Sequence, residues 1–271
     1  MAPTSVAARR TRFADLHTSG TFVMPNAWDT GSAMVLQSLG FDALATTSSG
    51  FAASLGRPDQ SVTLSELVGH VRDLCALLEV PISVDSEFGY SADLAGLSRT
   101  VGQLAAAGAA GVSIEDHLPG RGVIGVEEAT DRVGRFTEAA HAEDLMVTAR
   151  AENHLYGIED LDDTIARLHS YRSSGADVLY APGLSDIEEI ARLVREVSAP
   201  VNVLLATDGP TVAELTEVGV RRLSTGGSLA FVAYGAVASA ARELIASGTT
   251  GFASGALTGA ERATAFRPGP N

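Results

Sequence analysis

The chain has 271 residues, of which 45% are hydrophobic and 19% charged, and it carries a formal net charge of -14. A chain of this length buries on the order of 75% of its surface on folding, so it needs no disulfide or structural metal to hold a core. The acidic balance argues against nucleic acid as a partner, because affinity for phosphate backbones comes mainly from clustered Lys and Arg. All 19 basic residues are Arg, which excludes chemistry that needs a lysine amine, such as Schiff-base aldolases, pyridoxal-phosphate enzymes and Walker-A nucleotide sites.

Cysteine usage and apolar runs indicate the compartment. Cys75 is the single cysteine, so the chain forms no internal disulfide and no CxxC metal site. We find no basic segment followed by an apolar signal core, and we expect a cytoplasmic protein. The longest apolar runs, such as residues 229–241, contain Gly and Ser and are shorter than the roughly 20 residues that span a bilayer. The sequence therefore predicts no membrane partner.

The chain alternates between strand and helix patterns. One short helix is expected around residues 10–16, and from residue 21 short β-branched runs alternate with segments whose apolar residues recur at three and four positions. The predicted strands are 21–25, 42–47, 81–86, 110–115, 144–150, 177–181, 200–206 and 221–225, and the helices that follow them are 30–39, 64–78, 92–107, 127–142, 161–174, 187–197, 211–218 and 228–245. Eight βα units in about 230 residues favour an α/β fold of the (β/α)8 TIM barrel type over a doubly wound sheet.

Glycines mark the predicted turns from helix to strand. Gly40, Gly108, Gly175 and Gly219 each separate a helical pattern from an apolar strand, as is typical of a left-handed helix C-cap. No composition shift indicates a second domain, so we expect a single domain over residues 1–271, with the barrel at about 21–247 and a C-terminal helical extension at 248–271. The N-terminal helix is a candidate plug for the barrel bottom. The extension frames the active-site face, exchanges with a neighbouring subunit or is disordered.

Acidic residues follow two neighbouring predicted strands. Asp85 and Glu87 follow the third strand and, being two positions apart, share a face, while Glu115 ends the fourth strand. The active site of such a barrel lies at the carboxyl ends of its strands, so we expect the three carboxylates to converge. They would repel one another unless a cation lies among them, and an all-oxygen set suits Mg2+ or Mn2+. The alternative is that one or two of them cap helices or pair with arginines.

A long polar connection follows the second predicted strand, at residues 46–59. Its small residues allow backbone N–H groups to approach a ligand closely, as an oxyanion site requires. Asp59 follows Pro58 in this connection, where turn chemistry alone accounts for it equally well.

Seven short motifs carry a resemblance to a known family. They are Pro-Asn-Ala-Trp-Asp at 25–29, Ser-Gly-Phe at 49–51, Gly-Arg-Pro-Asp at 56–59, Asp-Ser-Glu-Phe-Gly at 85–89, Ile-Glu-Asp at 114–116, Ala-Arg at 149–150 and Ala-Pro-Gly at 181–183. In this order, over nearly the whole barrel, they resemble the isocitrate lyase / phosphoenolpyruvate mutase superfamily. The resemblance implies a Mg2+-dependent enzyme that acts on 2-oxo or 2-hydroxy acids through an enolate.

The resemblance also implies roles for individual residues. Asp85, Glu87 and Glu115 would hold the metal, largely through water, and Glu115 would also belong to the catalytic set. Asp59 falls where the family has a carboxylate that contacts the substrate or metal-bound water. Arg150 falls where it has an arginine that clamps the distal acid group, which suits the two-pronged geometry of a guanidinium.

The substrate site is expected to draw on two further segments. By match to the family motif, Ser49, Gly50 and Phe51 would cradle the substrate carboxylate and oxyanion through backbone N–H and hydroxyl groups. Asn153 and His154 follow the fifth predicted strand and are candidates for contacts to the substrate. Loop packing accounts for them equally well.

The chain departs from the family pattern at two places. Isocitrate and methylisocitrate lyases resemble this chain but carry a Cys and Lys in the loop after the fourth strand, whereas residues 117–125 contain neither. His117 or Arg121 is a candidate source of the missing proton or charge, the alternative being two solvated loop residues. Pro182 stands where related members place a His or Glu, so the substrate cannot be copied from a relative.

The sequence thus predicts a lyase that breaks a carbon-carbon bond in a substituted malate-like acid through an enolate, with Mg2+ (or Mn2+) and a small carboxylic acid as ligands. The alternatives are a phosphonopyruvate-type carbon-phosphorus enzyme, an oxaloacetate hydrolase or decarboxylase, and a non-catalytic metabolite-binding barrel. The resemblance further implies a homo-oligomer, a dimer or tetramer that exchanges a C-terminal helix.

Overall fold

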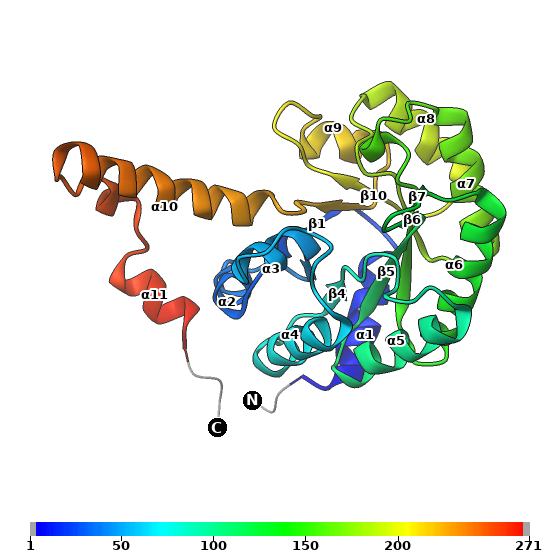
Figure 1. The fold of residues 1–271 in the computed structure, drawn as a ribbon, viewed down its shortest axis with the longest axis horizontal. Helices are drawn as coiled ribbons and strands as arrows, with labels where there is room; N and C mark the ends of the chain where they lie inside the picture. The colour runs from blue at the N-terminus through cyan, green and yellow to red at the C-terminus, as the bar shows by residue number, and fades with distance from the viewer. Residues whose placement is uncertain (1–3, 268–271) are drawn as a thin grey trace.

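The computed structural model describes residues 4–267, and a parallel sheet forms its centre (Figure 1). Within these residues the sheet contains β1 (Phe22–Met24), β2 (Asn26–Ala27), β3 (Leu44–Thr46), β4 (Ile82–Val84), β5 (Gly111–Glu115), β8 (Met146–Arg150), β9 (Val178–Tyr180), β10 (Val201–Leu204) and β11 (Arg222–Ser224). The order is β1-β11-β10-β9-β8-β5-β4-β3-β2. Because Pro25 divides a single strand into β1 and β2, which pair with β11 and β3, the sheet closes into a barrel of eight strand positions. The predicted (β/α)8 fold is confirmed.

Helices surround the closed sheet as the sequence pattern predicts. They are α2 (Thr30–Ser38), α4 (Leu64–Leu77), α5 (Leu94–Ala106), α6 (Val126–His141), α7 (Leu161–Ser173), α8 (Ile187–Val197) and α9 (Val212–Glu217). Thr63 and Glu66 form a reciprocal capping box at the start of α4. Just after the carboxyl end of α5, Gly108 has a φ of 100°, and an added Cβ would lie 2.9 Å from the Cβ of Cys75. This turn therefore requires glycine.

The helix α1 (Val6–Leu16) closes the bottom of the barrel, as expected for the N-terminal segment. Its Phe13 is 1% exposed and belongs to a buried cluster with Met24, Ala43, Ala45 and Ala110. The guanidinium of Arg9 fixes the helix to α4 by donating to the carbonyl oxygens of residues 75 and 78, at 2.7 and 2.6 Å. The bottom of the barrel is thus sealed, and its open end is the one at which the strands terminate.

Two local elements between β3 and α6 were not predicted. Residues 46–59 contain α3 (Ser48–Ser54), whose N-cap Thr47 accepts a hydrogen bond from the backbone of Gly50. After β5, the chain forms a small antiparallel hairpin of β6 (His117–Leu118) and β7 (Gly122–Val123). Both elements are too short for their periodicity to be read from the sequence. They lie at the carboxyl ends of the strands, where they shape the mouth of the barrel.

The helix α10 (Ser228–Ser247) leaves the barrel and projects as an arm, followed by η2 (Gly251–Gly255) and α11 (Gly259–Ala265), which returns to contact α2 (Figure 1). The barrel therefore ends near Gly227 in this structure, earlier than the expected boundary at 247. Ala230 is the one buried residue within α10. By length and composition alone, this helix of 20 residues is apolar enough to cross a membrane. The expectation that every apolar segment is too short to do so was wrong, because the helix continues beyond the apolar run at 229–241.

Phe13→Ala tests whether the bottom plug stabilises the barrel. We expect the free energy of unfolding to fall by about 3–5 kcal/mol, because a fully buried aromatic ring is lost and the sealed bottom leaves a cavity. Urea denaturation followed by circular dichroism measures the change. Leu39→Ala is the control, because Leu39 is 70% exposed and its truncation should cost little. Equal losses in the two variants would contradict the plug.

Candidate active site

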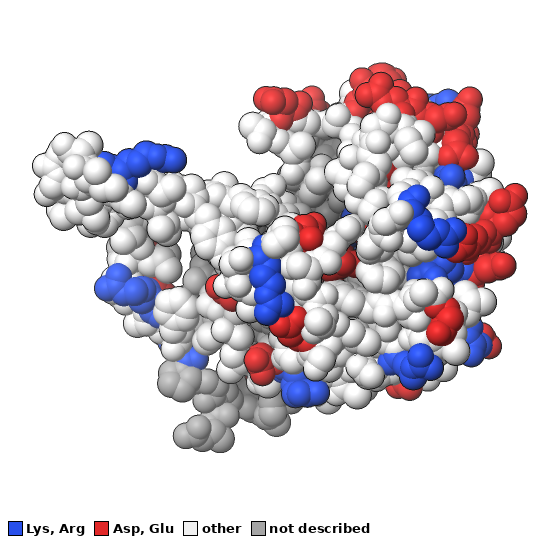
Figure 2. Space-filling view, viewed as in Figure 1, with Lys and Arg blue, Asp and Glu red and all other residues white. Residues whose placement is uncertain are grey.

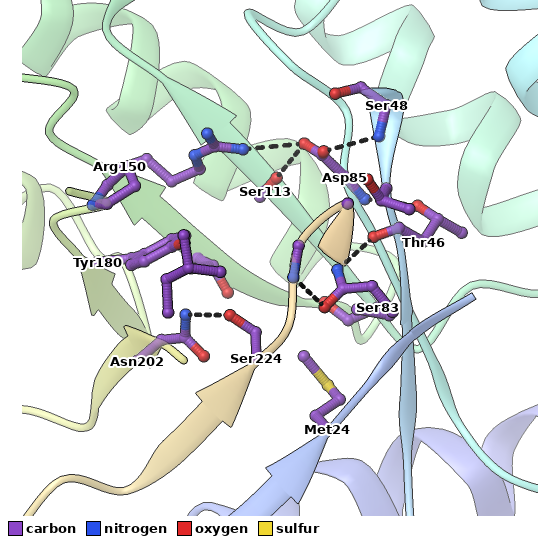
Figure 3. Close-up of a pocket in the computed structure, with 18 of the residues that line it drawn as sticks. Met24, Thr46, Ser48, Ser83, Asp85, Ser113, Arg150, Tyr180, Asn202 and Ser224 are labelled. Atoms are coloured by element: carbon purple, nitrogen blue, oxygen red, sulfur yellow. Dashed lines mark hydrogen bonds and ion pairs between the residues drawn. The ribbon is translucent and has the colours of Figure 1, made fainter. Parts of the chain in front are cut away.

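A cavity of about 290 Å3 opens at the carboxyl ends of the strands (Figure 3). Its upper wall contains Ser48, Ser49, Asp59, Asp85 and Arg150, which come from α3, the loop after it, and the ends of β4 and β8. Polar side chains are therefore concentrated where a barrel of this kind places its active site.

The centre of this wall is an arginine surrounded by acids. Arg150 lies at the end of β8, and its guanidinium contacts Asp85 at 3.0 Å, Glu115 at 3.4 Å and Glu152 at 2.7 Å. Burial opposes its charge, but the three carboxylates outweigh burial and raise the pKa of Arg150 above its ordinary value. The guanidinium therefore stays protonated and is held in one orientation.

Backbone and hydroxyl groups of the adjacent strand ends fix Asp85. The backbone N–H of Ser48 donates to its carboxylate at 3.0 Å, and the backbone N–H of Asp85 itself donates to the hydroxyl of Thr46 at 2.8 Å (Figure 3). The start of α3 thus ties the connection at 46–59 to the carboxylate of β4. Asp85 is the predicted metal ligand that lines the cavity.

The other two predicted metal ligands are more deeply buried. Glu87 is 2% exposed, has a φ of 47°, which is uncommon for a residue with a side chain, and accepts a hydrogen bond from the Tyr90 hydroxyl at 2.6 Å. Burial, with smaller contributions from Asp85 and Asp59, raises the pKa of Glu87 to about 7 against the opposing hydrogen bond. Burial likewise raises the pKa of Glu115, and Arg150 offsets this only in part.

The chemistry of this donor set fits a hard divalent cation. Among the residues described, 4–267, no three Asp, Glu, His or Cys side chains are grouped so that they could hold a metal ion, and Arg150 contacts two of the predicted ligands, Asp85 and Glu115. The donors at the strand ends are nevertheless carboxylate oxygens, the ligand type of Mg2+. Burial is the main cause of the raised pKa values of Glu87 and Glu115, and additional positive charge beside these acids would favour their ionised forms. A cation held through water by Asp85, Glu87 and Glu115 would supply it.

Of the three residues predicted to cradle the substrate, Ser49 lines the cavity, whereas Gly50 and Phe51 do not. The hydroxyl of Ser49 is 3.2 Å from that of Thr47. The backbone N–H groups of Gly50 and Phe51 already donate within the first turn of α3. Gly50 serves close packing, because an added Cβ would lie 2.6 Å from the Thr47 methyl group and 2.9 Å from Trp28. Phe51 stacks on the ring of His70, with centroids 3.9 Å apart.

The two predicted proton or charge donors of the strand-four loop lie outside the cavity wall. The ring of His117 stacks on that of Tyr156 at 3.9 Å, with the amide of Gln60 3.4 Å from its Nδ1 atom. Burial lowers the pKa of His117, so the imidazole is neutral near pH 7. Arg121 turns outward in the hairpin and forms a bidentate pair with Glu128 at 2.7 Å.

The two residues predicted after strand five serve the loop itself. Asn153 is fully buried and donates to Asp163 at 2.7 Å, while its Oδ1 atom has no partner among the described residues. His154 begins η1 (His154–Tyr156) and lines a separate cleft with Gly183 and Glu159. In this structure, neither of the two side chains reaches the cavity wall.

Sequence analysis missed a buried network that holds the strand ends together. Asp116 accepts from the Tyr171 hydroxyl at 2.6 Å, from Arg167 at 3.1 Å and from the backbone N–H of Glu152 at 2.9 Å. Glu152 in turn holds Arg150. The sequence does show Asp116 and Glu152 just after two neighbouring strands. Only the fold shows that Asp116 contacts Tyr171 and Arg167 and that Glu152 contacts Arg150.

It also missed the lower wall of the cavity. That wall consists of polar side chains on the inner face of the barrel, and its residues include Ser83, Ser113, Thr148, Asn202, Arg222 and Ser224. On each strand these residues alternate with apolar ones. The alternation was the signal that could have found them.

Fold and site together define a barrel enzyme with a carboxylate and arginine site at its strand ends, and comparison with known proteins gives its family. A family model described as phosphoenolpyruvate phosphomutase matches residues 13–245. The chain is 36% identical over 216 residues to an uncharacterized protein of Mycobacterium tuberculosis, covering 79% of this chain and 81% of that one. It is 28% identical to the 2-methylisocitrate lyase of Escherichia coli, over 71% of this chain and 64% of the lyase.

Solved structures agree. A Burkholderia cenocepacia protein described provisionally as a lyase or mutase shares 43% identity and superposes with a TM-score of 0.91, covering 94% of this chain and 95% of that one. The chain therefore belongs to the phosphoenolpyruvate phosphomutase family, within the isocitrate lyase / phosphoenolpyruvate mutase superfamily, and is an enzyme of its lyase and mutase type. The resemblance stated from the motifs is confirmed.

Glu87→Gln tests the charge imbalance at the site. In the unfolded chain Glu87 titrates near its ordinary pKa of 4.5 and in the folded, metal-free protein at about 7. The stability contributed by its bound proton is full below pH 4.5 and is lost as pH rises through 7. We therefore expect Glu87→Gln to melt a few degrees higher than the wild type at pH 8 and to show little difference at pH 4.5. Calorimetry in chelator at both pH values measures this, and a pH-independent difference would contradict it.

Proposed function

We propose that this protein is a Mg2+-dependent carbon-carbon lyase that acts on a substituted malate-like 2-hydroxy or 2-oxo acid through an enolate. The observation that carries the proposal is the convergence of Asp85, Glu115 and Arg150 beside a cavity at the strand ends. Carboxylate oxygens suit the cation, and a fixed guanidinium suits the acid group of the substrate. Membership of a family of lyases and mutases supports the same reaction class.

Arg150 and Ser49 have separate roles in binding the substrate. Arg150 is held by Glu152 through its Nε atom, so the opposite edge of its guanidinium can exchange Asp85 for a substrate carboxylate. The hydroxyl of Ser49 lines the cavity and donates to a substrate oxygen. Asp85, Glu87 and Glu115 would hold a divalent cation, which would supply Lewis-acid stabilisation of negative charge on the substrate.

Asp59 is the proposed base. It lines the cavity, and its Oδ1 accepts from the backbone N–H of Gln60 at 2.9 Å. With a 2-hydroxy acid, it takes the proton of the substrate hydroxyl as the carbon-carbon bond breaks to a carbonyl and an enolate, and it returns that proton to the enolate carbon. A single group then accepts and donates one proton, so neither His117 nor Arg121 is required for this step.

An assay of oxo-acid release tests the function. The panel contains malate derivatives, 2-methylisocitrate, oxaloacetate and phosphonopyruvate, each with Mg2+ and with chelator. We expect chelator-sensitive release from one malate-type acid, and we expect Asp85→Asn to lower turnover by about a hundredfold or more. Asp42→Asn is the matched control, because Asp42 pairs with Arg12 on the surface, away from the cavity. Release from phosphonopyruvate alone would instead support carbon-phosphorus chemistry, and metal binding without any release would support a non-catalytic barrel.

We also propose that the enzyme is a cytoplasmic homo-oligomer, a dimer or tetramer in which α10 packs against a second copy. The arm carries the exposed apolar residues Phe231, Val232, Tyr234, Val237, Leu244 and Ile245. Figure 2 shows it almost free of charge, in contrast to the acidic surface over α7 and α8. An apolar surface of this kind favours protein over solvent.

The double variant Val232→Glu, Val237→Glu tests the oligomer. Val232 is 69% and Val237 67% exposed in the single chain, so the substitutions should leave the barrel folded. We expect the wild type to elute as a dimer or tetramer and the variant as a smaller species, because burying two carboxylates in an apolar interface is unfavourable. Light scattering after size exclusion measures the mass. A wild type of monomer mass would contradict the proposal, as would an unchanged mass of the variant.

A further inference from the structure

The cavity continues below the active site into the interior of the barrel. The interior of such a barrel is usually filled with bulky branched side chains. Here many lining residues below the site are small or polar, namely Ala45, Ser83, Ser113, Thr148, Asn202 and Ser224. Figure 3 shows Ser83, Ser113, Asn202 and Ser224 around this space, beside the larger Met24 and Tyr180. The small lining residues leave the interior open, so a ligand can extend inward from the mouth.

A buried arginine forms the floor of this space. Arg222, on β11, is 3% exposed and reaches across the interior, donating to the hydroxyl of Thr148 on β8 at 2.8 Å and to Oδ1 of Asn202 at 2.9 Å. β9 and β10 lie between the two strands that it joins. Its guanidinium therefore lies inside the barrel, where it lines the cavity.

Unlike Arg150, Arg222 has no acid beside it. Within residues 4–267, no ion pair joins its guanidinium to a carboxylate; its third side-chain hydrogen-bond partner is His17 at 3.4 Å, and the Tyr180 phenol also lies close enough to act on its charge. Burial lowers the pKa of His17 to about 3, so this imidazole is neutral, and lowers that of Arg222 to about 9, so the guanidinium is still charged near pH 7. A buried charge without a counter-ion is costly, and an anion in the cavity would relieve that cost.

We propose that the barrel interior is an anion subsite in which Arg222, with Asn202 and Ser224, receives a carboxylate. This inference rests on the proposed function and deepens it: of the two carboxylates of a malate-like acid, one is held at the mouth by Arg150 and the other is directed inward to Arg222. Thr148 precedes Arg150 by two residues on β8, a rise of about 7 Å, so the two arginines address opposite ends of one small ligand.

Calorimetric titration of the metal-free protein with malonate, succinate and glutarate, in chelator, tests the subsite. We expect Arg222→Met to weaken binding of the best of these acids by about tenfold or more, because it removes a charged hydrogen-bond donor from the cavity. Arg221→Met removes the neighbouring, partly exposed arginine, whose guanidinium donates to the carbonyl of Gly20, and should leave the affinity unchanged. Equal affinities in wild type and Arg222→Met, or no binding to the wild type, would overturn the subsite.

A second variant guards against misfolding of the first. Ser83 lines the same space, so Ser83→Val fills part of the interior while it keeps Arg222. This variant should therefore also weaken binding of the dicarboxylate. If Arg222 serves the fold alone, Arg222→Met should melt at lower temperature while the binding of Ser83→Val stays at the wild-type level, and the proposal fails.

Competition with formate distinguishes two sources of the bound anion, the second carboxylate of the substrate and a separate small anion. If the subsite takes the substrate's own second carboxylate, formate competes with the dicarboxylate in an Arg222-dependent manner. If formate binds through Arg222 without competing, the subsite takes a separate small anion, and the assignment of a two-ended substrate is overturned. These titrations need no turnover, so they are independent of the release assay. If no acid is cleaved but binding depends on Arg222, the proposed lyase activity is contradicted and the subsite stands. If an acid is cleaved but binding does not depend on Arg222, the lyase activity stands and the subsite is contradicted.

Discussion

The contact between Arg150 and three carboxylates organises the active-site end of this barrel. One guanidinium joins the exits of β4, β5 and β8, because Asp85, Glu115 and Glu152 each lie within 3.4 Å of it. Without it, these acids would face one another in a buried setting, where mutual repulsion is strong. The same contact keeps Arg150 charged and oriented, so the group that stabilises the strand ends is also the one prepared to bind an acid.

The loops around this centre are held by buried polar contacts of their own. Asp116 links the exit of β5 to α7 and to the backbone of Glu152, and the first turn of α3 reaches Asp85. Such a fully partnered network costs little to bury and fixes one geometry. By contrast, Arg222 lies deeper and has neutral partners, so the barrel has one compensated and one uncompensated arginine along a single cavity. That asymmetry favours a ligand with acid groups at both ends.

The arm formed by α10 leaves an apolar surface exposed to solvent in the single chain. α10 follows directly after β11 but does not cover its own barrel, and its apolar side chains lie exposed. The sequence predicted a helix there, at 228–245, from apolar residues that recur at three and four positions. Whether such a helix packs on its own barrel or on another copy depends on the geometry of the turn at Gly226 and Gly227, which periodicity does not encode.

The sequence alone determined the eight βα units, because strand and helix periods differ and glycines mark the turns, and its motifs determined the superfamily. It also located Asp85, Glu115 and Arg150 at strand ends and Asp59 in the connection after the second strand. Only the tertiary structure decided which acids meet the arginine, that Gly50 serves close packing, and that Arg121 turns away from the cavity. Those outcomes depend on side-chain direction across strands far apart in the chain, where contact is set by closure of the sheet rather than by local pattern. For the same reason, the open interior and its buried Arg222 emerged only once the barrel had closed.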